Sequence, residues 1–139
     1  MKLFAIACAF TAVTVVCPAL ALSADHTGDS LDTVEKNLGA RKAVMVDVRE
    51  DKETNEGYVD GAILVPLSLL TEGSKTDDFD QVLTQQIPAK SIVYIYCAAG
   101  QRCLAAADIL TRFGYRVRPL RQGYDDLVRE GFVTAKPRN

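Results

Sequence analysis

Apolar residues follow two different rhythms along this chain, and these rhythms predict helices that alternate with strands. Over residues 29–38 they lie three and four positions apart and stop before Gly39, which is typical of a short amphipathic helix. Residues 43–49 form a β-branched apolar run too short for a helix, so we expect a buried strand that ends in charged residues. A polar helical stretch over residues 50–56 and a brief strand over residues 61–66 follow.

The second half of the chain repeats this alternation. Residues 91–96 show no alternation of polar and apolar side chains, as expected when both faces of a central parallel strand are covered. The other expected elements are a loop over residues 71–78, helices over residues 79–87, 103–113 and 124–129, and a strand over residues 116–120. The pattern predicts an α/β fold with a mainly parallel sheet flanked by helices. Sites in such folds lie at the carboxyl ends of strands, where residues 47–50 and 97–102 fall.

The first two dozen residues have a different character from the rest. Lys2 precedes an almost unbroken apolar run over residues 3–16, and an Ala-x-Ala exit at residues 19–21 and a second possible point at Ala24 offer cleavage sites, which is typical of a secretory signal peptide. A retained membrane anchor is the alternative, but Pro18 interrupts the run before the roughly 20 apolar residues of a spanning helix. We therefore expect a signal peptide over residues 1–24, cleaved near 21–24, and a periplasmic or secreted mature protein with no stable membrane insertion.

Composition limits what the mature part can do. Of 139 residues about 115 remain after cleavage, enough for one domain over residues 25–139. A net charge of −2 without a Lys/Arg block argues against a nucleic-acid partner. Two cysteines remain, Cys97 and Cys103, too few for a disulfide scaffold. The single histidine, His26, lies beside the cleavage region, so we expect it in a mobile tail. That placement excludes a catalytic histidine and a histidine-rich metal site, and we expect no cofactor or metal.

The segment between Cys97 and Arg102 carries the most chemistry. Its small residues and Gly100 let the backbone curl so that successive N–H groups point at one spot, which makes an anion cradle. The start of the following helix adds unpaired amides and a positive dipole end. Such a field favours the nucleophilic thiolate of Cys97, and it places Arg102 where an anionic substrate would bind. The alternative is that Cys97 is a buried cysteine with a purely structural role.

Four segments in order resemble the rhodanese-like family, and particularly its small single-domain exported members of the periplasmic, phage-shock type. They are VDVRE (46–50), GYVDGAILVP (57–66), YIYCAAGQR (94–102), and GY (114–115) with RQGY (121–124). Together they span nearly the whole mature chain. The sequence departs from the family pattern at Tyr58, where histidine is common, and near Gln122 and Tyr124, where a second glycine and a tryptophan are common.

The resemblance implies a thiosulfate sulfurtransferase. Cys97 would take sulfane sulfur from thiosulfate or a similar small donor, hold it as a persulfide and pass it to a thiophilic acceptor such as cyanide, a small thiol or a thiol protein. The substrate cradle would be formed by Ala98, Ala99, Gly100, Gln101, Arg102 and Cys103. Arg102 would neutralise the sulfonate of thiosulfate, Arg49 would border the pocket, and Asp47 would organise the adjoining loops.

Three alternatives remain open. A cysteine phosphatase or arsenate reductase of similar fold would place five residues between the cysteine and the arginine, whereas Cys97 and Arg102 enclose four. A thiol redox protein would use Cys103 to attack a persulfide or sulfenic acid on Cys97, although the spacing is not Cys-x-x-Cys. An inactive rhodanese-fold binding module is disfavoured because Cys97 is present.

Overall fold

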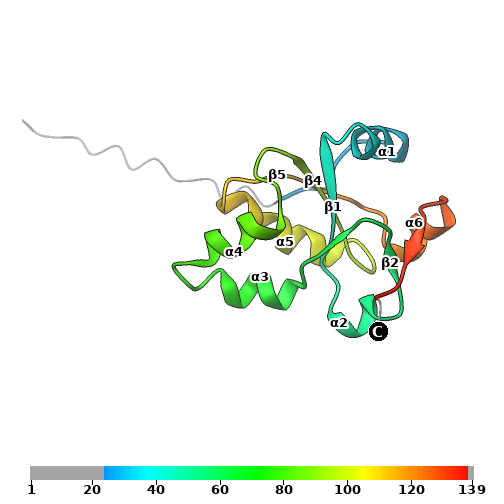
Figure 1. Ribbon diagram of the computed structural model, residues 1–139. Helices are drawn as coiled ribbons and strands as arrows, with labels where there is room; N and C mark the ends of the chain where they lie inside the picture. Colours follow the sequence, from blue (N-terminus) through cyan, green and yellow to red (C-terminus); the bar gives the residue numbers. More distant parts are fainter. Residues whose placement is uncertain (1–23, 138–139) are drawn as a thin grey trace, which may run out of the picture.

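The computed structural model describes residues 24–137, and these residues form a parallel sheet between two layers of helices (Figure 1). Except for Ala24, the signal peptide expected at the N-terminus lies outside the described residues. The sheet has the order β3-β1-β4-β5, and every pair in it is parallel. Its strands are β1 (Ala43–Asp47), β3 (Ile63–Leu64), β4 (Ile92–Tyr96) and β5 (Arg116–Pro119). This confirms the predicted α/β architecture.

The helices divide between the two faces of the sheet (Figure 1). One face is covered by α3 (Leu67–Gly73), α4 (Phe79–Gln86) and α5 (Gln101–Arg112), the other by α1 (Leu31–Gly39) and α6 (Tyr124–Arg129). Val93 and Ile95 of β4 pack with the first group, whereas Tyr94 and Tyr96 pack with the second. Since successive strand residues face opposite sides, a strand covered on both faces must be apolar throughout, which explains the continuous pattern of β4.

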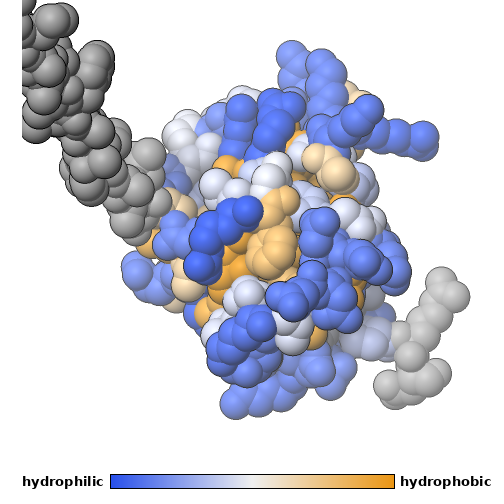
Figure 2. Space-filling view, turned by 90° about the vertical axis from the view of Figure 1, so that its left-hand side faces the viewer, coloured by the Kyte–Doolittle hydropathy of each residue, from blue (hydrophilic) through white to orange (hydrophobic). Residues whose placement is uncertain are grey.

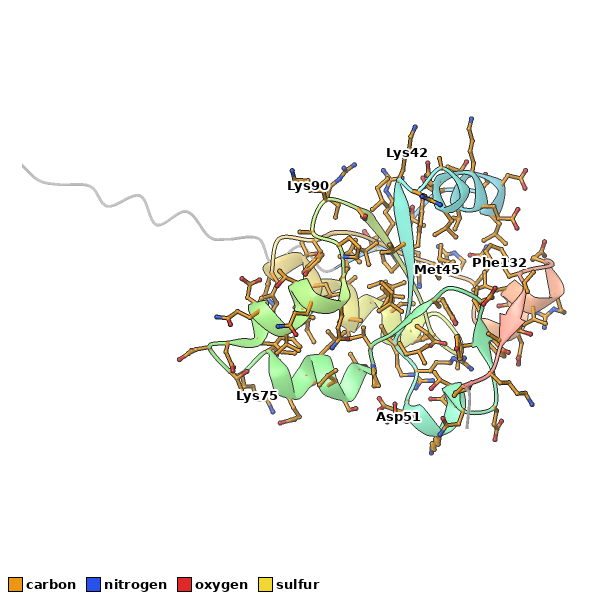
Figure 3. The ribbon with its side chains drawn as sticks, in the orientation of Figure 1. Lys42, Met45, Asp51, Lys75, Lys90 and Phe132 are labelled. Atoms are coloured by element: carbon orange, nitrogen blue, oxygen red, sulfur yellow. The ribbon has the colours of Figure 1, made fainter. Side chains whose placement is uncertain are left out.

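The register of the two central strands brings their carboxyl ends together. Asp47 of β1 lies opposite Tyr96 of β4, and the Val48 amide donates to the Tyr96 carbonyl at 3.1 Å. Figure 3 shows Lys42 and Lys90 at the edge where these strands begin and Asp51, in α2 (Asp51–Thr54), at the opposite edge. The chain after Asp47 and the chain after Tyr96 therefore meet at one edge of the sheet.

Two features of the fold differ from the prediction. The expected loop over residues 71–78 is wrong at its start, because α3 continues to Gly73. A two-stranded antiparallel ribbon of β2 (Tyr58–Val59) and β6 (Thr134–Ala135) was not predicted. Both elements are short, and a strand of two residues cannot display the period-two pattern by which strands are recognised.

The segment before α1 is bound to the domain. The Ala24 amide donates to Asp108 of α5 at 2.7 Å, and the Thr27 amide donates to the Pro119 carbonyl at the end of β5 at 2.7 Å. The Asp29 carboxylate accepts hydrogen bonds from Tyr94 and Arg118. Residues 24–29 thus lie along β5 and α5, so the expectation of a mobile tail around His26 is wrong.

The face of the molecule on the side of α3 and α4 is mostly polar (Figure 2). Figure 2, which looks onto the side of α3 and α4, shows charged and polar side chains around a small apolar area. Leu69 of α3 and Val82 of α4 are large apolar side chains that remain exposed. Within residues 24–137, no helix combines the length and apolar character needed to span a membrane.

Candidate active site

The loop after β4 turns sharply at Gly100. This residue is the N-cap of α5 and has a left-handed backbone with φ +82°, which glycine adopts without steric cost. A Cβ at this position would lie 2.7 Å from the Arg121 carbonyl oxygen. Helix α5 begins at Gln101, two residues earlier than expected, so its unpaired amides lie within the loop. The left-handed backbone and the close approach of the Arg121 carbonyl both require glycine at position 100.

Cys97 lies at the centre of this loop with only 1% of its surface exposed. Its Sγ accepts a hydrogen bond from the Gly100 amide at 3.1 Å and contacts the thiol of Cys103. The hydrogen bond from Cys103 is the largest cause that lowers the pKa of Cys97, burial opposes it, and the amides of Ala99, Cys103 and Arg102 lower it further, to about 5. Cys97 is therefore a thiolate at neutral pH, which is the nucleophilic form of cysteine.

Cys103 is fully buried beneath this thiolate. The two Sγ atoms are 3.7 Å apart, and both residues are free cysteines. Its thiol also lies 2.8 Å from the Gly100 carbonyl oxygen and 3.3 Å from that of Leu120. The neighbouring Cys97 and burial both raise the pKa of Cys103, so this residue keeps its proton. The pair consists of one thiolate and one thiol.

The segment before α6 closes over the loop. The Tyr124 amide donates to the Cys97 carbonyl at 2.9 Å, and a Cβ on Gly123 would lie 1.8 Å from the Ala98 carbonyl oxygen. Ala98 and Ala99 face solvent on the other side. Gly123 therefore permits the close approach that fixes the loop. The sequence did not predict this role of Gly123, although Gly123 belongs to the segment RQGY that carries the family resemblance.

His26 reaches the same loop from the N-terminal segment. Its Nε2 lies 2.9 Å from the Gly100 carbonyl oxygen. Because a carbonyl oxygen only accepts hydrogen bonds, this contact requires the hydrogen on Nε2. A lone histidine 71 positions before Cys97 carries no sequence pattern that would link it to this loop.

Arg102 is partly exposed at the first turn of α5 and is already paired. Its two terminal nitrogens donate to the two carboxylate oxygens of Glu53, each at 2.7 Å. This fork lowers the pKa of Glu53 to about 2, so the carboxylate stays ionised. Gln101 beside it is exposed. The structure therefore gives Arg102 an internal anionic partner, and its role toward a substrate remains a prediction.

Asp47 and Arg49 form a buried ion pair at the end of β1. The Asp47 carboxylate accepts from the Arg49 amide at 2.9 Å and from its guanidinium at 2.7 Å, and that guanidinium also donates to the Gly57 carbonyl. The Arg49 side chain lies 4.0 Å from the centre of the Tyr124 ring. These contacts tie together the segments after β1, before β2 and at the start of α6. With 5% of its surface exposed, Arg49 is held within the domain.

A small pocket opens beside the loop. It is lined by Arg49, Glu53, Glu56, Ala98, Tyr124 and Asp125. The structure places Arg49 next to the loop through Ala98, with its guanidinium paired to Asp47, and its role toward a substrate stays a prediction. Across residues 24–137, no group of three or more His, Cys, Asp or Glu side chains is placed to hold a metal ion.

These features define a class of site: a cysteine thiolate in a short cradle between a central parallel strand and a helix N-terminus. The Rhodanese-like domain family model matches residues 30–130. The chain therefore belongs to the rhodanese-like domain family.

Relatives and solved structures agree with this assignment. A mitochondrial protein of Schizosaccharomyces pombe, named as a candidate thiosulfate sulfurtransferase, is 32% identical over 85 residues, which cover 59% of this chain and 60% of that protein. A sulfurtransferase of Allochromatium vinosum is 27% identical over 110 residues, covering 78% and 94%. The human single-domain sulfurtransferase TSTD1 superposes with a TM-score of 0.61 at 23% identity, covering 73% and 95%. A rhodanese-related protein of Thermoplasma volcanium gives 0.60 at 23% identity, covering 76% and 94%. At these identities the two structures show the shared fold.

Proposed function

We propose that this protein is a sulfurtransferase that moves sulfane sulfur from thiosulfate, or a similar small donor, to a thiophilic acceptor through a persulfide on Cys97. The observation that carries the proposal is the Cys97 thiolate. It accepts a hydrogen bond from the Gly100 amide at 3.1 Å, in a loop with four residues between Cys97 and Arg102. The names of the fission yeast and Allochromatium relatives support the same reaction class.

The first half-reaction transfers one sulfur atom to the enzyme. The Cys97 thiolate attacks the sulfane sulfur of thiosulfate, the sulfur–sulfur bond of the donor breaks, and sulfite leaves with the bonding electrons. The loop amides and the N-terminal end of α5 stabilise the negative outer sulfur of the persulfide. The low pKa of Cys97 supports this step because the attacking thiolate is already formed.

The second half-reaction regenerates the thiolate. Cyanide or a thiol attacks the outer sulfur, the bond to Cys97 breaks, and Cys97 leaves as a thiolate. A thiolate of low pKa is a good leaving group in sulfur exchange. Exposed Ala98 and Ala99 form the outer side of the loop, where small side chains leave room for an acceptor.

Intact-mass spectrometry tests the proposal. Reduced mature protein sampled early after addition of thiosulfate should carry the mass of one added sulfur atom, and cyanide added at that point should take this sulfur as thiocyanate. Cys97→Ser is the matched control, because it keeps the size of the side chain but supplies no thiolate. If this variant stays folded by circular dichroism yet transfers sulfur at the wild-type rate, the assignment to Cys97 is wrong.

We also propose that the mature protein is exported to the periplasm or secreted, on the basis of the basic start, apolar run and small-residue exit of residues 1–24. N-terminal sequencing of protein from the exported fraction should give a start near Leu22 or Asp25. An intact Met1 recovered from membranes would instead mean a retained anchor.

A further inference from the structure

The sulfur atoms of two cysteines, Cys97 and Cys103, lie in contact inside this loop. Sulfur transfer through a persulfide requires only one cysteine, so the second has no role in the proposed function. The Sγ atoms of Cys97 and Cys103 are 3.7 Å apart, whereas a disulfide bond is about 2.05 Å long. Their side chains are 1% and 0% exposed, so an external thiol reaches Cys103 only after the loop opens. Cys103 is therefore the nucleophile nearest to any persulfide on Cys97.

The protonation states of Cys97 and Cys103 favour a reaction between these two residues. Cys97 is the thiolate and Cys103 is the thiol, with its sulfur near the carbonyl oxygens of Gly100 and Leu120. Once Cys97 holds a second sulfur, the negative charge moves to the outer atom, and Cys103 offers the proton of a thiol whose sulfur lies 3.7 Å from Cys97 Sγ. A hydroxyl at position 103 would also donate a hydrogen bond, but it could not form a sulfur–sulfur bond.

We propose a further activity that rests on the proposed persulfide: Cys103 resolves it and releases inorganic sulfide. Cys103 Sγ attacks Cys97 Sγ, a bond forms between these atoms, and the bond from Cys97 Sγ to the outer sulfur breaks. The outer sulfur leaves with that electron pair and takes the proton of Cys103 as hydrosulfide. In this step the outer sulfur is reduced to sulfide and Cys103 Sγ is oxidised, while Cys97 Sγ passes from the persulfide to the disulfide without a change of oxidation state.

The loop assists this step on the leaving-group side. The amides that hold a persulfide anion also stabilise negative charge on the departing sulfide. The cycle closes when a dithiol reductant restores both cysteines by thiol–disulfide exchange. The net reaction converts thiosulfate and a dithiol into sulfite, sulfide and a disulfide, so the protein would act as a dithiol-dependent thiosulfate reductase.

A single-turnover experiment without added thiol tests this inference. Reduced mature protein and Cys103→Ser are loaded with thiosulfate under anaerobic conditions, freed of donor by gel filtration, and followed by intact mass and sulfide assay. The serine variant, the matched control, should keep the added sulfur atom. Wild-type protein should release one sulfide per chain and end two hydrogen atoms lighter than its reduced form, with a peptide that links Cys97 to Cys103.

Each outcome is decisive. Wild-type protein that keeps the sulfur as long as Cys103→Ser overturns the inference and leaves the sulfurtransferase intact. Absence of a sulfur adduct on both proteins, with no sulfide released, overturns the proposed function itself. If the serine variant does not fold, the wild-type measurement alone still separates a stable persulfide from a released sulfide.

Discussion

The Nε2 atom of His26 lies 2.9 Å from the carbonyl oxygen of Gly100, which also lies 2.8 Å from the Cys103 thiol. The Gly100 carbonyl, in the loop after β4, is thus contacted both by His26 of the segment before α1 and by Cys103. The Thr27 amide anchors this segment to Pro119 one residue further on. His26 therefore acts as a positioning residue, since it reaches Cys97 only through the loop backbone.

We expect His26→Ala to loosen the loop and to lower kcat/KM for thiosulfate. One hydrogen bond contributes about 0.5–1.5 kcal/mol, which corresponds to roughly a two- to tenfold loss. His26→Gln, which places an amide nitrogen in a position similar to that of Nε2, should restore most of the rate. Steady-state kinetics of both variants check this, and equal rates for alanine, glutamine and wild type would contradict the positioning role.

The second prediction concerns the competition between Glu53 and a sulfonate for Arg102. If Arg102 binds the anionic donor, Arg102→Ala should raise the KM for thiosulfate by roughly ten- to a hundredfold, because charge-assisted hydrogen bonds contribute about 1.5–3 kcal/mol. Glu53→Gln should lower that KM roughly two- to fivefold, because a partly exposed ion pair holds the arginine by about 1 kcal/mol or less.

The two variants together separate the alternatives. A higher KM for thiosulfate in Arg102→Ala together with a lower KM in Glu53→Gln would assign Arg102 to donor binding. An unchanged KM in Arg102→Ala would mean that the backbone amides bind the donor and that the Arg102–Glu53 pair only joins α5 to α2.

The third prediction is a pH dependence set by the lowered pKa of Cys97. The thiolate fraction should stay nearly complete between pH 8 and pH 6 and reach one half near pH 5. A cysteine of ordinary pKa, about 8.5, would lose most of its thiolate over the same range. The rate of iodoacetamide alkylation of Cys97 against pH, with the site identified by peptide mass, measures this directly.

Variants at position 103 test the cause of the shift. Cys103→Ala removes the largest contribution and should raise the Cys97 pKa by roughly one to two units, so that alkylation at pH 6 slows. Cys103→Ser keeps a hydrogen-bond donor and should leave the profile close to wild type. Identical profiles for both variants would assign the low pKa to the backbone amides alone.

The last prediction concerns the close approach at Gly123. Gly123→Ala forces a methyl group into the Ala98 carbonyl, so the loop must move, activity should fall sharply, and unfolding free energy should drop by about 1–3 kcal/mol. Gly39→Ala is the matched control, since a Cβ there meets nothing within 4 Å. Urea unfolding and kinetics of both variants provide the measurement, and wild-type activity in Gly123→Ala would contradict the packing role.

Several elements were predictable because their signals are local. The unbroken apolar run lies within β4 itself, and Gly114 lies directly after α5; α6 occupies residues 124–129 as expected. The parallel α/β architecture followed from their alternation, which the sheet order confirms. The placement of Cys97 between a buried strand and a helix was equally local, since strand, loop and helix are consecutive in the chain.

The tertiary structure alone decided what surrounds the thiolate. Contacts between Arg102 and Glu53, Gly123 and Ala98, and His26 and Gly100 join residues far apart in the chain. No periodicity links such positions, because each depends on how helices and loops pack across the sheet edge. The sequence by itself determined that Cys97 directly follows a buried strand and begins an amide-lined turn. Packing determined which carboxylate holds the arginine, which imidazole touches the loop, and that the second sulfur lies against the first.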